Sequence, residues 1–380
     1  RSATSSAKVR VPRMISLRWP GSSRDLLTVT RGGRIARLRT DRTRFLEERP
    51  TLEPLVSVII AAYNSGAWLT ETVESALAQT WPRREIIVVD DGSTPDLRPL
   101  LEPYKSAVSY IRQENAGAGA ARNTGIRAAS GDFIAFLDHD DVWLPDKLST
   151  QIAVAERHPE SGLIVCDGVQ FDGDRILRES LYSPALRERF AAVTGSEITD
   201  RFYREFLDSN QVACPAQTLI PRAVIERTGA LAMTRGEASD LDYYLRIAQV
   251  YPVTFQRDRL ARWRYLASSV SGPAERRPIE WAVMAVSVLS RHQALCAPEH
   301  RPMVASRLGD IARAAALKAF HYGCRQDRAY ARASLLKLRR LAPRESRAAL
   351  YLAALALPPA VLTALTQCWR QARGLWRVAE

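Results

Sequence analysis

Short apolar runs alternate with helical patterns between residues 55 and 141. The first run, 56–60, reads VSVII and is typical of a strand buried on both faces. The pattern predicts strands at 56–60, 85–91, 108–113 and 133–141, with helices at 68–79, 96–105 and 117–129 between them. Strands and helices that alternate in this way predict an α/β fold, a doubly wound domain with a mostly parallel sheet.

The pattern changes at both ends of this domain. Strands are predicted at 162–166, 218–220 and 253–255, with a helix at 239–250, before amphipathic helices follow at 279–295, 302–323, 327–341 and from 345 onward. Residues 1–50 show no sustained periodicity, although a short strand pair is expected around Gly32 and Gly33. We therefore divide the chain into a basic, largely irregular N-terminal arm (1–50), an α/β domain (51–272) and an all-α C-terminal region (273–380).

Charge is distributed unevenly along the chain. The net charge is +13, to which residues 1–50 contribute +9, residues 301–380 contribute +11 and the middle contributes −7. The basic ends suit an anionic membrane surface or an ordinary solvated surface, and both interpretations stay open. The acidic middle suits a site that holds a cation. No nucleic-acid partner is expected, because no aromatic–basic motif accompanies the basic ends.

Several features bear on where the protein works. No run of about 20 uninterrupted apolar residues and no secretory signal is found, and the five cysteines are scattered as in a reducing compartment. The apolar segment 348–366 is interrupted by Pro358 and followed by Trp369 and Arg370, as in core helices or in an interfacial anchor. We expect a cytoplasmic protein, with a peripheral contact on the inner face of the membrane as the open question.

Polar residues gather where the predicted strands end: Tyr63 and Asn64, Asp90 and Asp91, and the acidic run from Asp138 to Asp141. These groups belong in one site, because ligands of open α/β sheets bind at the carboxyl ends of the strands. The carboxylates of Asp138 and Asp140 can share one divalent cation with diphosphate oxygens. Asp90 and Asp91 can bind a base or a ribose, or one of them can serve as a turn or N-cap residue.

Two helix starts add further candidates. Asn115 and Gly117 belong to a glycine-rich turn that lets the backbone approach a ligand closely, and Arg122 follows on the helix, facing a donor or merely pairing. Asp240 and Asp242 lie in the first turn of the helix at 239–250, where the helix dipole stabilises carboxylates. The functional alternative makes one of them a general base toward an acceptor hydroxyl.

Four segments in this order resemble the family-2 inverting glycosyltransferases with the GT-A fold: VSVIIAAYN, EIIVVDDGST, ENAGAGAARNTGI and FIAFLDHDDVWLPDKL. The resemblance covers residues 55–270 and implies a nucleotide-sugar glycosyltransferase domain at 51–272. It implies that Tyr63 stacks on the nucleotide base, that Asp91 with Asp90 beside it binds base or ribose, and that Asp138 and Asp140 form the D-x-D motif. Asp140 is then the direct ligand of a divalent metal, Mn²⁺ or Mg²⁺. Asn64, Asn115, Gly117 and Arg122 complete the implied donor site.

The chain departs from the family pattern at two places. Asp240 matches the Asp of the usual Glu-Asp pair that supplies the base, but Ser239 stands where the Glu is expected. The segment 263–268 keeps Arg264 but lacks the His that often follows, so Arg264 is the remaining candidate for a contact with the diphosphate. The Q-x-x-R-W motif of processive synthases is also missing, which implies the transfer of one sugar per encounter.

The resemblance implies metal-assisted transfer from a nucleotide-diphosphate sugar to an acceptor hydroxyl with inversion, in the synthesis of a cell-surface polysaccharide or glycoconjugate. The acceptor is a glycan, a lipid-linked sugar or a protein. Two alternatives remain: a sugar-phosphate nucleotidyltransferase, which lacks its glycine-rich signature near Tyr63, and a non-catalytic nucleotide-sugar-binding module, which rests on Ser239 alone.

Overall fold

The computed structural model describes residues 53–231, 239–266, 277–358 and 361, together with two short strands near the N-terminus. These strands, β1 (Leu27–Val29) and β2 (Ile35–Arg37), pair in antiparallel fashion on either side of the glycines, which confirms the predicted strand pair. Residues from 54 onward form a separate compact unit. The predicted anchor residues Trp369 and Arg370 lie outside the described residues.

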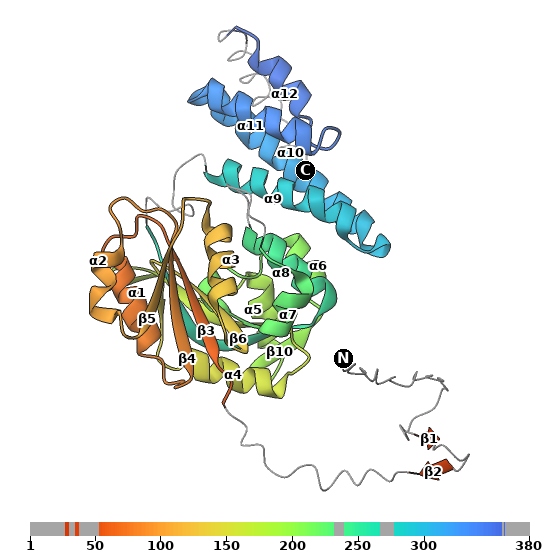
Figure 1. Cartoon of the computed structure of the whole chain (residues 1–380). Helices are drawn as coiled ribbons and strands as arrows, with labels where there is room; N and C mark the ends of the chain where they lie inside the picture. The colour runs from red at the N-terminus through yellow and green to blue at the C-terminus, as the bar shows by residue number, and fades with distance from the viewer. Residues whose placement is uncertain are drawn as a thin grey trace, which may run out of the picture. The chain divides into compact units, whose positions relative to one another are not determined.

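Four parallel strands form the first half of the main sheet (Figure 1): β3 (Val56–Ala62), β4 (Arg84–Asp90), β5 (Val108–Arg112) and β6 (Phe133–Asp138), in the order β6-β3-β4-β5. The intervening helices are α1 (Trp68–Leu77), α2 (Arg98–Leu101), the 3₁₀ turn η1 (Glu102–Tyr104) and α3 (Ala118–Ala128). The helix predicted at 96–105 is thus two short pieces, because Pro103 has no N–H to continue α-helical bonding.

Every residue of β3 is buried because helices cover both faces of the sheet. Val58 and Ile60 belong to one core with Leu69 of α1, whereas Ile59 points into the opposite core. Leu148 of α4 (Lys147–Arg157) joins the first core, and Leu245 of α8 (Ser239–Val250) joins the second. This burial confirms the α/β architecture and fixes the carboxyl ends of the strands in space.

The second half of the sheet is mixed. Strand β11 (Thr218–Pro221) runs antiparallel to both β6 and β8 (Leu163–Asp172), whereas β12 (Val253–Arg264) runs parallel to β8. The remaining strands are β7 (Val142–Trp143), β9 (Arg175–Arg178) and β10 (Glu197–Asp200), and the remaining helical pieces are α5 (Pro184–Ala191), α6 (Tyr203–Asp208), η2 (Pro215–Gln217) and α7 (Arg222–Thr228). Strands β8 and β12 are much longer than the predicted 162–166 and 253–255.

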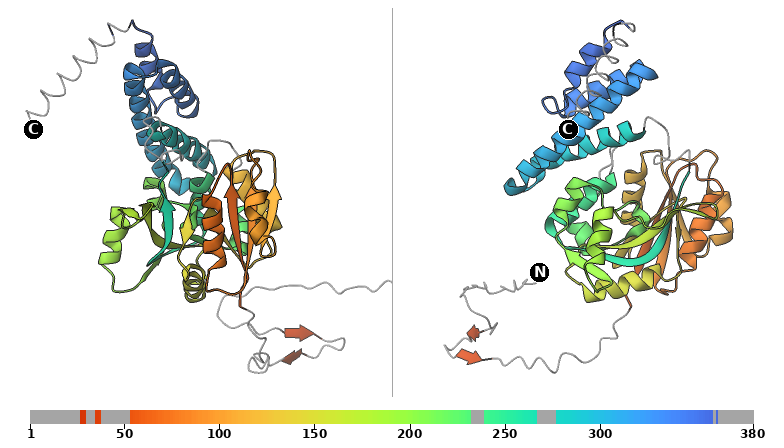
Figure 2. Two further views of the ribbon diagram at one scale, coloured as in Figure 1. Left: turned by 90° about the vertical axis from the view of Figure 1, so that its left-hand side faces the viewer. Right: turned by 180° about the vertical axis from the view of Figure 1, so that it is seen from behind.

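The C-terminal helices pack on the α/β part (Figures 1 and 2). They are α9 (Arg277–Leu295), η3 (Pro298–His300), α10 (Arg301–Arg325), α11 (Arg328–Leu341) and α12 (Ala348–Leu355), which confirms the predicted helical region. Arg307 of α10 donates to the Leu207 carbonyl at the end of α6, and Tyr203 contacts His292 of α9. None of the described helices combines the length and the apolar character that a membrane span requires.

Candidate active site

Neighbouring parallel strands bring the predicted acids to one edge of the sheet. Ala62 of β3 pairs with Asp90 of β4, and Ala61 pairs with Asp138 of β6, so the two acids flank β3. With a strand spacing near 4.8 Å, their backbones lie about 10 Å apart. Tyr63 follows β3 between them and is 49% exposed, so its ring is available to a ligand at this edge.

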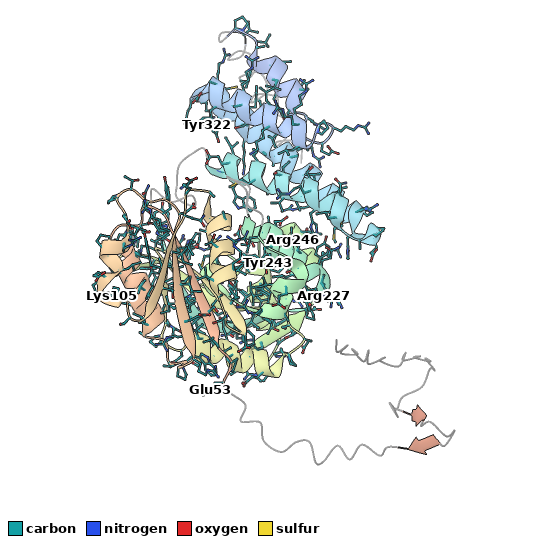
Figure 3. The ribbon with its side chains drawn as sticks, viewed as in Figure 1. Glu53, Lys105, Arg227, Tyr243, Arg246 and Tyr322 are labelled. Carbon is teal, nitrogen blue, oxygen red and sulfur yellow. The ribbon has the colours of Figure 1, made fainter. Side chains whose placement is uncertain are left out.

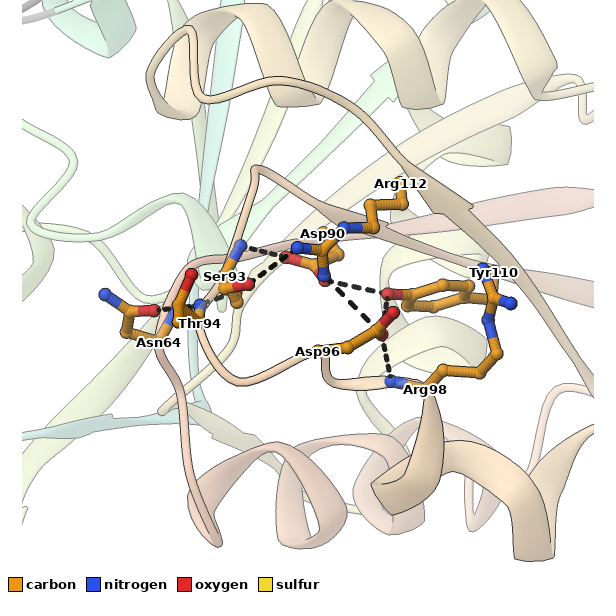
Figure 4. Close-up of polar contacts among 8 residues, drawn as sticks. All are labelled: Asn64, Asp90, Ser93, Thr94, Asp96, Arg98, Tyr110 and Arg112. Carbon is orange, nitrogen blue, oxygen red and sulfur yellow. Dashed lines mark hydrogen bonds and ion pairs between the residues drawn. The ribbon is translucent and has the colours of Figure 1, made fainter.

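The carboxylate of Asp90 is fully buried and holds the turn after β4 together (Figure 4). It accepts hydrogen bonds from the Ser93 N–H at 2.8 Å and the Tyr110 hydroxyl at 2.7 Å, and it forms an ion pair with Arg112 at 2.7 Å. Burial raises the pKa of Asp90, but these hydrogen bonds and the Arg112 charge outweigh it and hold the pKa below its ordinary value. Asp90 therefore stays ionised and shapes the turn.

Asn64 ties the end of β3 to the same turn. Its N–H donates to Ser93 Oγ at 2.9 Å, and its side-chain oxygen accepts from the Thr94 N–H at 2.9 Å (Figure 4). The Asn64 backbone adopts φ +49°, in the left-handed region that Asn tolerates better than most residues. The residue that follows the exposed Tyr63 is thus held in place by hydrogen bonds.

Asp91 holds the glycine-rich turn in place. One of its oxygens accepts from Gln113 Nε2 at 2.7 Å and the Ala116 N–H at 2.9 Å, and the other accepts from the Gly117 N–H at 2.7 Å. Asp91 is only 3% exposed. Its carboxylate therefore positions the turn from Asn115 to Gly117, at the start of α3, directly beside the strand ends.

The close approach of this turn depends on Gly92, which has φ +78° and where an added Cβ would lie 2.8 Å from the Asn115 backbone nitrogen. Replacement of Gly92 by Ala is expected to cost about 1–2 kcal/mol for the left-handed backbone and about 1–3 kcal/mol more for the overlap. Gly173→Ala is the matched control, because Gly173 has φ +56° and nothing within 4 Å of the added Cβ. Denaturant unfolding measures both, and equal losses would contradict the overlap.

Arg122 of α3 joins two acids that are distant in the sequence. Its buried guanidinium forms an ion pair with Asp138 at 2.5 Å. Asp240, in the first turn of α8, lies in the field of the same groups: burial raises the pKa of Asp240, the Arg122 charge lowers it and the Asp138 charge raises it. Arg122 thus pairs with Asp138, and Asp240 lies close enough to both residues for their charges to affect its pKa.

Asp242, the other acid at the start of α8, has a structural partner. It is 8% exposed and pairs with Arg246 one turn later at 3.0 Å. Arg246 also donates to the Ala230 carbonyl and lies over the Tyr243 ring. Figure 3 labels Arg246 and Tyr243. Through Arg246, Asp242 therefore holds α8 against the segment after α7. Of the two acids, it is Asp240 that interacts electrostatically with Arg122.

The acidic run after β6 is a tight turn, not the strand end that 133–141 predicted. The Asp141 N–H donates to the Asp138 carbonyl at 3.0 Å, which ends β6 at Asp138. Asp140 is partly exposed, and burial together with the Asp138 charge raises its pKa against the opposing effect of His139. Asp141 is 1% exposed, and its Oδ2 has no hydrogen-bond partner among the described residues. Burial and the neighbouring carboxylates raise the pKa of Asp141 as well, so additional negative charge is unfavourable in this turn.

Arg264, at the end of β12, donates hydrogen bonds to this turn. Its Nε donates to the Asp140 carbonyl at 2.8 Å, its backbone N–H donates to Asp141 Oδ1 at 3.0 Å, and its guanidinium pairs with Glu71 of α1. The guanidinium also lies 4.2 Å from the Trp68 ring centre. The Arg264 side chain contacts protein groups in this structure, and its expected contact with the diphosphate stays a prediction. The supporting Glu71 and Trp68 were not predicted.

A metal at this turn would draw only part of its coordination from the protein. The described residues contain no group of three or more His, Cys, Asp or Glu side chains arranged to hold an ion. Asp138 and Asp140 offer hard carboxylate oxygens, as Mg²⁺ and Mn²⁺ prefer, and Asp140 has an unfavourably buried charge. Mg²⁺ sites of one or two carboxylates are usually completed by water and substrate phosphates, so Asp138 and Asp140 fit as the protein ligands of such an ion.

Comparisons with known proteins concern the sequence of the chain and its fold. Residues 57–227 match the family model described as glycosyl transferase family 2. An uncharacterized glycosyltransferase of Rickettsia prowazekii is 30% identical over 221 residues, which make up 58% of this chain and 67% of the relative. The enzyme named UDP-Glc:α-D-GlcNAc-diphosphoundecaprenol β-1,3-glucosyltransferase WfaP, from Escherichia coli, is 45% identical over 104 residues, 27% of this chain and 41% of that protein. The chain thus aligns with less than half the length of WfaP.

A solved structure with the same fold illustrates the similarity. The mannosyltransferase PcManGT from Pyrobaculum calidifontis, in complex with GDP-Man and Mn²⁺, has a TM-score of 0.51 and is 19% identical. The match covers 86% of this chain and 92% of that protein. At this identity the likeness concerns the fold, which agrees with the expected GT-A architecture.

Proposed function

Because the chain belongs to glycosyl transferase family 2, we propose that it transfers one sugar from a nucleotide-diphosphate sugar to an acceptor hydroxyl, with inversion at the anomeric carbon. The observation that carries the proposal is the cluster at the carboxyl edge of the sheet. Asp138 and Asp240 share the field of Arg122 there, and Asp140 follows in the same turn. An acid placed for proton transfer next to acids suited to a cation is the combination that sugar transfer from a diphosphate requires.

The donor site is proposed along the ends of β3 and β4. Tyr63 stacks on the nucleotide base, and Asn64 with Asp90 keeps its segment in place. Asp91 acts mainly through the turn from Asn115 to Gly117, because its oxygens already accept three hydrogen bonds from this region. The first-turn N–H groups of α3, which have no partner within the helix, are proposed to point toward an anionic ligand.

Asp138 and Asp140 are the residues proposed to hold a divalent cation, Mn²⁺ or Mg²⁺. Such an ion, when bound, neutralises charge on the departing nucleoside diphosphate. Arg122 keeps the charge of Asp138 compensated, and Arg264 fixes the backbone of Asp140 through its carbonyl. The protein thus sets the position of both carboxylates before the donor arrives.

Asp240 is proposed to take the proton from the acceptor hydroxyl. The acceptor oxygen forms a bond to the anomeric carbon as the bond from that carbon to the diphosphate oxygen breaks on the opposite face. The proton ends on Asp240 and the electron pair leaves with the diphosphate. Burial raises the pKa of Asp240, which makes this carboxylate a better proton acceptor than an exposed one.

The acceptor is proposed to be a glycan, a lipid-linked sugar or a protein used in cell-surface polysaccharide or glycoconjugate synthesis. The lipid-linked choice is favoured because the name of the relative WfaP gives a sugar diphosphoundecaprenol as its acceptor. We propose a cytoplasmic location with a peripheral contact to the inner membrane face, with residues 51–272 as the catalytic domain and 273–380 as a helical region beside it.

A panel of nucleotide sugars, tested with Mn²⁺ by thermal shift and then for release of nucleoside diphosphate, examines the transferase proposal. The product's anomeric configuration, read by NMR coupling constants, must be opposite to that of the donor. Release of pyrophosphate from a nucleoside triphosphate would instead identify a nucleotidyltransferase. Donor binding without any turnover would identify a binding module.

The pH profile tests the coupling between Arg122 and Asp240. The base must be ionised, so kcat/KM falls as the pH drops through the pKa of Asp240. Since the Arg122 charge lowers that pKa, Arg122→Gln is expected to raise it and to shift the acid limb of the profile to higher pH. Arg122→Lys should keep the limb near its original position. An unchanged limb in a folded Arg122→Gln protein would contradict the proposed base.

A further inference from the structure

The outward face of α11 carries a cluster of cations that pair with no acid among the described residues. Arg332, Lys337, Arg339 and Arg340 are exposed, and the helix sequence RAYARASLLKLRRL contains no Asp or Glu. None of the four makes a hydrogen bond or an ion pair with another residue of the described chain. By contrast, Arg313 of α10 pairs with Asp310. We call these four residues the α11 basic face.

The direction of this face is fixed by packing. Ala331, Leu335 and Leu338 are buried against the neighbouring helices, and α11 contacts α9, α10 and α12. The opposite side of α11 must therefore face outward. Leu336 lies among the cations and is 43% exposed, an apolar side chain within a basic surface. In the following helix, Leu350 is 65% exposed.

We propose that the α11 basic face docks the protein on an anionic phospholipid surface. Lipid phosphates attract clustered Lys and Arg, and each cation adds independently to the binding, while an exposed leucine among them can enter the boundary between head groups and acyl chains. A nucleic acid would match the charge but would leave Leu336 without an apolar partner, and no exposed aromatic residue of α11 offers a stacking surface. The inference extends the membrane contact proposed above to particular residues and does not depend on the transfer chemistry.

Vesicle cosedimentation of the full chain tests this surface. We expect binding to vesicles of equal parts phosphatidylcholine and phosphatidylglycerol, little binding to phosphatidylcholine alone, and weaker binding as salt screens the charges. The variant R332Q/K337Q/R339Q/R340Q should lose roughly 600-fold in its partition coefficient, at about fivefold per cation. Leu336→Ser should weaken binding with the charge unchanged.

The matched control R175Q/R178Q/R187Q/R204Q removes the same charge from exposed positions on β9, α5 and α6 and should bind nearly as the unchanged protein does. Equal losses in the two variants, or equal binding to both vesicle types, would overturn the proposal. So would displacement by low inorganic phosphate, or tighter binding to RNA than to anionic vesicles. Nucleoside diphosphate release with a water-soluble acceptor should be the same in both variants, so a failed docking surface is separable from a failed transferase assignment.

Discussion

Asp140→Ala is expected to abolish sugar transfer with every nucleotide sugar, by about a thousandfold or more. Asp140 is a partly exposed carboxylate in the turn after β6, and both burial and the neighbouring Asp138 raise its pKa. A bound cation would stabilise the ionised form of such a carboxylate strongly. Without it, the remaining acids are Asp138, which Arg122 already compensates, and Asp141, which is buried. Neither can replace the lost ligand without rearrangement of the turn.

A second measurement separates loss of the cation from loss of the fold. The unchanged protein should be stabilised by Mn²⁺ together with a nucleoside diphosphate in a thermal shift assay, and Asp140→Ala should lose that stabilisation while keeping its unliganded melting temperature. Asp174→Ala, at an exposed position in the turn between β8 and β9, is the control and should change neither reading. Turnover or Mn²⁺-dependent stabilisation retained by Asp140→Ala would remove Asp140 from the proposed site.

The apolar pattern predicted the parallel half of the sheet because burial on both faces leaves a direct mark in the sequence. Strand β3 is buried at every position and reads as an apolar run interrupted only by Ser57. The long strand β12 leaves no such mark, because Arg257, Asp258 and Arg259 are exposed in its middle and interrupt the apolar pattern. The strand is continuous because it pairs with β8 along its length, and the register of this pairing is irregular at the same three residues. Pairing partners of this kind are set by tertiary structure rather than by local sequence.

In the site, too, features that depend on local sequence could be predicted, and contacts between distant segments could not. Strand ends locate Asp90, Asp91 and Asp138, so their grouping follows from the topology alone. The sequence gives no sign that Asp91 holds the backbone at Gly117, or that Arg264 reaches Glu71, 193 residues away. Such contacts depend on where two distant segments end in space. For this reason the sequence predicts the acids of the site well and the residues that support them poorly.

Asp240→Asn is expected to lower kcat by about 10²–10⁴-fold, the usual contribution of a general base, while donor binding stays nearly unchanged. The amide keeps the size of the side chain and cannot accept the hydroxyl proton. In the unchanged protein, kcat/KM should fall as the pH drops through a pKa that burial has raised above that of an ordinary Asp. The residual activity of the variant should lose this acid limb, because the titrating group is gone.

Asp242→Asn is the informative companion to Asp240→Asn, two residues along the same helix. Asp242 pairs with Arg246, so its substitution should reduce the free energy of unfolding and leave the acid limb of the pH profile in place. Asp240→Asn should instead remove the acid limb and leave the free energy of unfolding nearly unchanged. A buried neutral amide replaces a desolvated charge there, which costs the fold little. A calorimetric titration with donor and Mn²⁺ completes the comparison. If Asp240→Asn binds donor normally and still transfers sugar at the original rate, the proton must go to another group, and the cluster around Arg122 would be structural.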